Sequence, residues 1–260
     1  MSPHHRPRFH SSSLVALLTQ WAQQAGGAPA MPAVDVAEQL GQWLSTVDAV
    51  TLGRSLHAIE SLPAEPGRPL DLQGLEADVQ RAKAELTGWA SAPPAAPRPA
   101  RARADNTRAE APDPQAEAEF GFHSPRYLGL QKQMDARLLA LRAEVRQALA
   151  QGPRALRQLA VLDAVMEQMA GGREQRLWAS LPGHLERRFA HLRQAHGQRL
   201  ASRGLEDAPQ RWREAGGWLA AFERDLQALL LAEMHVRLQP IMGLLEAARN
   251  ENLEWKKRQE

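Results

Sequence analysis

The residue whose position most invites chemistry is Asp163, a carboxylate inside an apolar stripe formed by Leu159, Leu162 and Met166. An ionised carboxylate buried without a partner is costly, so Asp163 should lie against a cation. Such a carboxylate could serve catalysis, but the pattern favours an interhelical ion pair that fixes the register of two helices. The predicted partners are the arginines close to it in sequence, Arg173, Arg176, Arg187 and Arg188.

The nine histidines are the next candidates, because imidazole is a common metal ligand. His184, His191 and His196 fall on one predicted helix, with spacings of seven and five residues. Two ligands on one helical face need a spacing of three or four, so we predict no metal site. His196 lies on the apolar stripe of this helix, which is typical of a hydrogen-bonded core histidine.

No catalytic or cofactor motif stands out elsewhere. The chain has no cysteine, which excludes disulfides, thiol nucleophiles and thiolate metal sites. The glycine pairs that begin at positions 26, 171 and 216 lack the lysine and the strand-turn-helix context of a phosphate-binding loop. We therefore expect a non-enzymatic protein without a cofactor.

Positive charge is concentrated in the second half of the chain. The 260 residues include 32 basic and 30 acidic side chains, a net charge of +2. Residues 1–90 carry −3, residues 91–119 carry −1 and residues 120–260 carry +6. The basic half could bind phosphates, and its densest run consists of arginines 187, 188, 193, 199 and 203. At 100° per residue they scatter along both borders of an apolar stripe, which is typical of exposed rims, so nucleic-acid binding is the alternative function.

The elements that must position these residues are all predicted to be helices. No segment alternates with period two over a useful length, and β-branched and aromatic residues are too few for a sheet. The predicted fold is all-α, with a small N-terminal helical module at residues 1–90 and an antiparallel bundle of long helices at residues 120–260. The Pro-, Ala- and Arg-rich residues 91–119 between them are predicted to be a disordered linker.

Apolar periodicity predicts where the helices lie. In the first module we expect four helices. The first ends near residue 24, the second covers residues 34–44, the third starts at the capping-box-like Ser45 and the fourth covers residues 72–89. The third of these should turn inward the stripe Ala49, Leu52, Leu56 and Ile59. In the second module we expect a helix from the N-cap Ser124 to Gln151, separate helices at residues 154–170, 172–182 and 183–202, and a last long helix starting at Pro209.

The last predicted helix carries two apolar rows, and the second one is rotated by roughly a quarter turn from the first. A helix that is apolar on two flanks touches two neighbours, and Trp255, beside a charged end, suits an anchor for a partner. We therefore predict a helical scaffold or adaptor that binds another protein or itself. Its predicted interaction residues are Met234, Leu238, Met242, Leu245 and Trp255.

Two segments resemble an uncharacterised proteobacterial family of unknown function. They are LGQWLSTVDAVTLGRSL, from Leu40 to Leu56, and LAVLDAVMEQMAGGREQRLWASLPGHLERRFAHLR, from Leu159 to Arg193. Members of that family are encoded near genes resembling proton-channel and outer-membrane-anchor proteins. The resemblance therefore implies service to an envelope-linked assembly, and it supplies no catalytic residues.

The N-terminal apolar run, residues 14–18, is too short for a secretory signal. No window in the sequence suggests a membrane span. We expect a cytoplasmic protein without membrane insertion.

Overall fold

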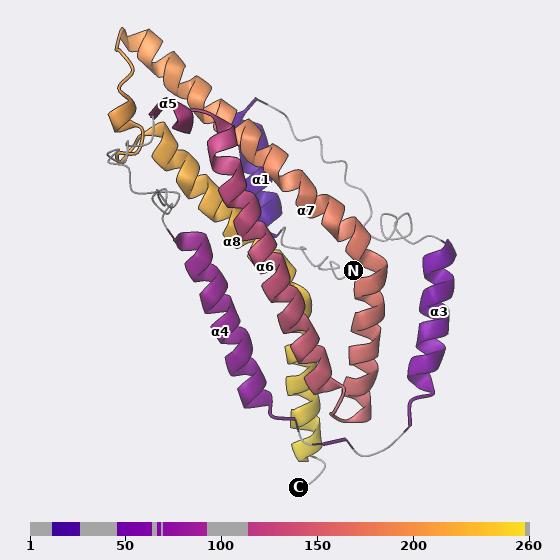
Figure 1. The fold of residues 1–260 in the computed structure, drawn as a ribbon. Coiled ribbons are helices and arrows are strands. Elements are labelled where there is room, and N and C mark those ends of the chain that lie inside the picture. The colour runs from indigo at the N-terminus through magenta and orange to yellow at the C-terminus, as the bar shows by residue number, and fades with distance from the viewer. Residues whose placement is uncertain (1–11, 27–45, 64–66, 69, 93–113, 258–260) are drawn as a thin grey trace, which may run out of the picture. The chain divides into compact units, whose positions relative to one another are not determined.

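A computed structural model describes residues 12–26, 46–63, 67–68, 70–92 and 114–257. All regular elements in these ranges are helices, which confirms the all-α prediction (Figure 1). The predicted helix at residues 34–44 and most of the predicted linker lie outside the described ranges. The elements are α1 (Ser13–Gln24), α3 (Thr46–Glu60), α4 (Leu72–Ser91), α5 (Pro114–Glu117), α6 (Phe120–Leu149), α7 (Arg154–Arg203), the 3-10 turn η1 (Pro209–Arg211) and α8 (Trp218–Lys257).

The chain forms two compact units that do not follow the predicted division at the linker. One unit comprises residues 1–29, 99–123 and 184–236, and the other comprises residues 30–98, 124–183 and 237–260. Each unit therefore contains helices from both halves of the sequence. Helices α1 and α4 each bury apolar side chains in a unit that also contains long helices from the second half.

The first unit contains α1, α5, the start of α6, the second half of α7, η1 and the first half of α8. Ser12 caps α1 by accepting a hydrogen bond from the Val15 amide, and the helix buries Leu14 and Trp21. Arg188 of α7 secures α1, because its guanidinium lies over the Trp21 ring and also donates to Gln24 at 2.6 Å.

The second unit contains α3, α4, most of α6, the first half of α7 and the second half of α8. Helix α4 buries the whole of its predicted stripe, Leu75, Val79, Ala82 and Leu86. Two ion pairs border this helix. Nε of Arg137 in α6 lies 3.2 Å from Oε2 of Glu85, and Nη2 of Arg249 in α8 lies 2.6 Å from Oε1 of Glu76.

Helix α7 is one continuous helix of 50 residues, where three separate helices were predicted. Gly171 and Gly172 remain helical because an interior glycine costs only about 1 kcal/mol, which tertiary packing can offset. Pro182 removes one backbone hydrogen bond but lies beside the buried Leu181 and Leu185. The packing of these two leucines offsets the local cost.

Helix α6 begins at Phe120, so the predicted start at Ser124 was also wrong and Pro125 lies inside the helix. The additional turn brings Phe120 and His123 into the aromatic core of the first unit. Helix α5 and the buried Ala118 belong to the segment that was predicted to be linker. The linker prediction was therefore too long at its C-terminal end.

Helix α8 begins at Trp218 rather than at Pro209. The carbonyl of Trp212 accepts hydrogen bonds from the amides of Leu219 and Ala220, at 3.1 and 3.0 Å, and so satisfies two free donors of the first turn. Gly216 adopts a φ of 91°, and a Cβ at Gly217 would overlap the carbonyls of Arg211 and Trp212. The two glycines therefore make this tight N-terminal junction possible.

By length and composition, α8 is apolar enough to cross a membrane over residues 218–254, in contrast to the prediction that no window suggests a span. Half of the 18-residue apolar window within this helix is buried inside the protein. The helix also carries Glu233, which is fully buried, and Arg237, which pairs with Asp135 of α6. These contacts are those of a central helix in a bundle.

Candidate functional site

Asp163 is paired, but not with the arginines that were predicted. Arg142 of α6 donates to it from two nitrogens, at 2.9 and 2.6 Å, and Arg146 lies at 3.4 Å. Arg146 also pairs with Glu167. Burial opposes the charged form of Arg142, but the hydrogen bond and the charge of Asp163 outweigh it, and the pKa of Arg142 is raised. The cluster is an interhelical clamp between α6 and α7.

The predicted partners were wrong because α7 does not fold back on itself. Within one helix, ten residues span about 15 Å along the axis, so Arg173 lies beyond the reach of Asp163. Arg173 instead pairs with Asp48 of α3 at 3.0 Å, and Arg188 pairs with Asp225 of α8 at 2.6 Å. Arg187 donates to His184, and the side chain of Arg176 is exposed.

The predicted interaction row on α8 is mostly inside the protein. Met234, Leu238 and Leu245 are only 1–3% exposed, because neighbouring helices cover both apolar rows of α8. Met242 alone in this row is exposed. Trp255 belongs to α8, but its side chain lies outside the described residues. The row therefore contributes to the core and offers no continuous docking surface.

Helix α3 exposes part of the apolar stripe that was expected to be buried. Its inner face consists of Asp48, Leu52, Ser55 and Ile59, rotated from the predicted stripe, and only Ile59 is fully buried. Leu56 of the predicted stripe is 42% exposed. Val47 and Val50 are 73% and 49% exposed. A helix of 15 residues with this exposed apolar surface is a candidate interaction element.

Polar contacts with α7 explain the orientation of α3. Arg154, Arg157 and Gln158 donate to the carbonyls of Glu60, Pro63 and Ile59 at 2.6, 2.8 and 3.0 Å. These side chains satisfy carbonyls at the C-terminal end of α3, where helical partners are missing. The Asp48–Arg173 pair holds the other end. Four polar contacts thus fix a face that the apolar periodicity did not select.

His123 is a buried titratable residue that the sequence analysis missed. Its side chain is 3% exposed and lies among Phe122, Phe189 and Phe222. Nε2 lies 2.9 Å from the carbonyl of Glu117 and therefore donates to it, while Nδ1 lies 3.6 Å from Glu223. The predicted helix start at Ser124 left His123 between the predicted linker and the helix, where no periodic pattern marks it.

Two of the three histidines on α7, His184 and His196, contact other side chains. His196 lies 3.0 Å from Asp207, which also accepts from Trp212 Nε1 at 2.8 Å. Burial alone would raise the pKa of Asp207, but the hydrogen bonds from His196 and Trp212 outweigh it and lower that pKa. Burial and the nearby Arg187 lower the pKa of His184. In the described part of the chain, no cluster of three metal-ligating side chains occurs.

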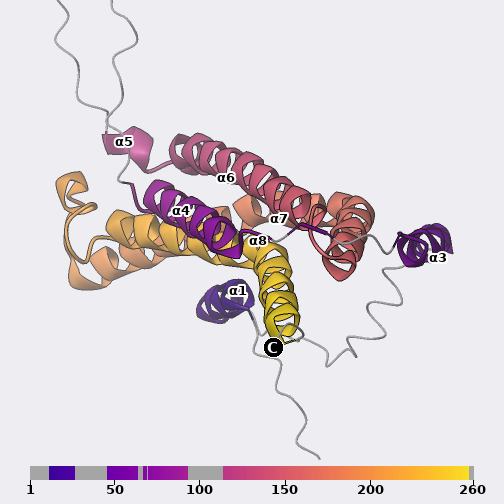
Figure 2. The ribbon, with the colours of Figure 1, turned by 90° about the horizontal axis from the view of Figure 1, so that it is seen from below.

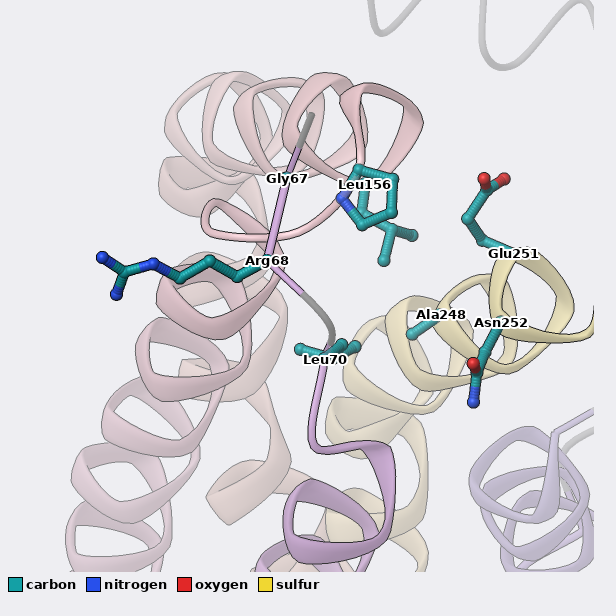
Figure 3. Close-up of a pocket in the computed structure, with 8 residues that line it drawn as sticks. Gly67, Arg68, Leu70, Leu156, Ala248, Glu251 and Asn252 are labelled. Atoms are coloured by element: carbon teal, nitrogen blue, oxygen red, sulfur yellow. The ribbon is translucent and has the colours of Figure 1, made fainter. Parts of the chain in front are cut away.

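A small cavity of about 80 Å³ lies in the second unit (Figure 3). The backbone of Gly67 crosses it so closely to Gly152 that a Cβ at position 67 would overlap the Gly152 carbonyl. The Arg68 amide donates to Gln151 at 2.9 Å. The walls of the cavity are mainly apolar, and the Arg68 side chain points away from the cavity in Figure 3. This cavity holds no convergent polar groups that would orient a substrate.

These observations define an all-α protein whose charged clusters join helices together. The chain belongs to the family described as protein of unknown function (DUF3348), which matches residues 1–250. No match was found among curated proteins or among solved structures.

Proposed function

We propose that this protein is a non-enzymatic helical adaptor that binds another protein through the surface around α3. The resemblance noted above adds that the adaptor serves an envelope-linked assembly. The observation that carries the proposal is the exposure of Val47, Val50 and Leu56 on one short helix. Val47 and Val50 are three residues apart and therefore neighbours on the helix surface, and adjacent exposed apolar side chains favour an interaction site.

The attachment of α3 supports the same proposal. Among the described side chains of this helix only Ile59 is buried, and hydrogen bonds and an ion pair with α7 also hold the helix. Such contacts position a helix without covering its apolar side chains. The exposed residues are therefore available to a partner while the helix itself stays in place.

Nucleic-acid binding by the basic half remains the second candidate. Among the arginines of the dense run, Arg188 is paired with Asp225, and Arg193 lies 3.2 Å from Glu119. These ion pairs neutralise positive charge on the two arginines that phosphate binding would require. A titration with a single-stranded oligonucleotide at two salt concentrations tests this candidate, because phosphate contacts weaken steeply with salt.

Site-specific photocross-linking in the native cell tests the adaptor proposal. The full-length protein would carry a photoreactive residue at position 50, and a matched protein would carry it at position 128. Leu128 is the control because it is 46% exposed on α6, close to the 49% of Val50. We expect a discrete cross-linked protein from position 50 that disappears with Val47→Ser. Identical products from both positions, or none from position 50, would contradict the proposal.

A further inference from the structure

Resting on the adaptor function proposed above, we infer that the partner element is an acidic amphipathic helix that packs along α7 beside α3. Three observations lead to this inference. They are an uncharged row of residues with coiled-coil spacing on α7, exposed valines next to it, and arginines that no carboxylate on this side compensates.

The first observation concerns the exposed side of the first half of α7. Six residues there are spaced alternately by four and three, as in the seam of a coiled coil. Five of the six are exposed and one is half-buried. We call this row the α7 seam, and it consists of Val161, Val165, Gln168, Gly172, Gln175 and Ala179.

The α7 seam is uncharged and has the shape that a second helix needs. Its 19 residues span about 27 Å, the length of five turns. A Cβ at Gly172 would meet nothing within 4 Å, so the centre of the seam is open to a close approach. Small residues at Gly172 and Ala179 allow helix axes to come near each other, while Val161 and Val165 supply apolar contact.

The second observation is the position of α3 next to this seam. Figures 1 and 2 show α3 beside the first half of α7, and the Asp48–Arg173 pair and the Gln158 contact confirm an antiparallel register. Projected at 100° per residue, Val47 lies on the flank of α3 that borders the α7 seam. Because Val47 is 73% exposed, it extends the apolar surface of the seam.

The third observation is the charge at the borders of the seam. Arg54, Arg154 and Arg176 are exposed, and in the described structure none of them makes an ion pair. Arg154 donates to a backbone carbonyl, which leaves its positive charge uncompensated. This border is therefore cationic.

The carboxylates of α3 and of the first half of α7 do not neutralise these border arginines, because they interact with other arginines or lie on another face. Asp48 pairs with Arg173, and Asp163 and Glu167 pair with arginines of α6. Glu174 interacts electrostatically with Arg142. At 100° per residue, Glu60 lies on the flank of α3 away from the seam. A partner helix with acidic residues beside its apolar stripe therefore complements this surface in both charge and shape.

A protein helix fits these observations better than a nucleic acid. Single-stranded nucleic acids bind aromatic platforms on which bases stack, and the α7 seam and its borders contain no aromatic residue. Valine, alanine and glycine at heptad spacing match a helix instead. The remaining occupants, a second copy of this chain and an RNA, are separate outcomes of the experiment.

Fluorescence anisotropy with the full-length protein and designed peptides tests the inference. The probe is an 18-residue helical peptide with leucine and alanine on one face and glutamate beside them, and its twin carries lysine in place of every glutamate. We expect the glutamate peptide to bind, and the lysine peptide to bind at least tenfold more weakly. Raising the salt concentration from about 0.05 to 0.3 M should weaken the binding of the glutamate peptide several-fold.

Three variants localise the binding. Arg176→Glu and Arg54→Glu should each raise the Kd of the glutamate peptide about tenfold, because each reverses one border charge. Gly172→Leu should abolish binding by filling the centre of the seam, and it leaves the protein folded because nothing lies within 4 Å of that position. Arg211→Glu is the matched control, since Arg211 is exposed in the other unit and should have no effect.

The outcomes separate this inference from the proposed function. Equal affinity for both peptides, or no effect of Gly172→Leu, overturns the acidic helix even if photocross-linking at position 50 succeeds. A single-stranded RNA that competes with the peptide, or concentration-dependent self-association that Gly172→Leu abolishes, assigns the seam to that occupant and overturns the inference. If cross-linking at position 50 fails but the glutamate peptide still binds the seam, the proposed role of α3 is overturned and the inference about the seam stands.

Discussion

Arg142 holds Asp163 with two parallel hydrogen bonds, from Nε to Oδ2 at 2.9 Å and from Nη2 to Oδ1 at 2.6 Å. This two-pronged geometry is specific to a guanidinium facing a carboxylate and is sensitive to register. The Asp163 side chain is 9% exposed and that of Arg142 is 13% exposed. A shift of α6 along α7 would therefore leave two nearly buried charges without partners.

Replacing Asp163 tests how much this clamp stabilises the second unit. Asp163→Asn keeps the size of the side chain but leaves Arg142 without its main counterion. Removing one partner of a largely buried pair costs about 3 kcal/mol, so the melting temperature should fall by roughly 5–10 °C. Differential scanning calorimetry would measure it. Glu246→Gln, at an exposed position of α8 in the same unit, is the control, and an unchanged melting temperature for Asp163→Asn would refute the clamp.

Two glycines in the first and second units should respond in opposite directions to alanine. Gly217→Ala places a Cβ against the carbonyls of Arg211 and Trp212, so the start of α8 must distort and stability should fall by about 2 kcal/mol or more. Gly172→Ala meets no atom and improves helix propensity, so it should stabilise α7 by up to about 1 kcal/mol. Urea unfolding measures both. Equal effects would contradict the tight junction before α8.

The lowered pKa of Asp207 predicts that the protein loses stability in acid. The hydrogen bonds from His196 and Trp212 lower its pKa below the ordinary 3.8, against the effect of burial. The native state then binds fewer protons than the unfolded state, so this contribution is complete above about pH 4 and disappears as the pH falls through the lowered pKa. Thermal melts between pH 5 and pH 2.5 should show a shallower acid slope for Asp207→Asn. Glu206→Gln, an exposed neighbour, should keep the wild-type slope.

Local periodicity was sufficient to predict helices whose burial follows their own apolar stripe. Helix α4 is the clearest case, because Leu75, Val79, Ala82 and Leu86 were predicted inward and all four are buried. In α3 the same reasoning failed, since Leu56 is 42% exposed. The difference lies in partners distant in sequence. Arg154 and Gln158 bind the carbonyls at the end of α3, and a sequence pattern within α3 cannot reveal them.

Signals that break helices in isolation misled the prediction of element boundaries. Gly171, Gly172 and Pro182 indicated three helices, but packing of Leu181 and Leu185 keeps α7 continuous. That continuity also explains why Asp163 could not reach Arg173. His123 was missed for a related reason, because the Ser124–Pro125 start signal hid the earlier turn of α6. Tertiary contacts decided each of these positions.

Substitutions in α1 and α4 test whether each unit combines segments from both halves of the sequence, as the structure indicates. Trp21 of α1 belongs to the first unit and Leu86 of α4 to the second, and both are buried. Replacing either by alanine removes a large core side chain and should cost about 3 kcal/mol. Hydrogen exchange should show the loss in different places, because local stability follows the unit in which the contacts lie.

We expect Trp21→Ala to reduce amide protection in residues 184–236 and Leu86→Ala to reduce it in residues 124–183. An independent N-terminal module would behave differently, since both substitutions would then weaken only residues 1–90. Loss of protection confined to that range would restore the division at the linker. Ala77→Ser, at an exposed position of α4, is the control and should leave both regions unchanged. The two regions should respond separately, because Trp21 belongs to the unit that contains residues 184–236 and Leu86 to the unit that contains residues 124–183.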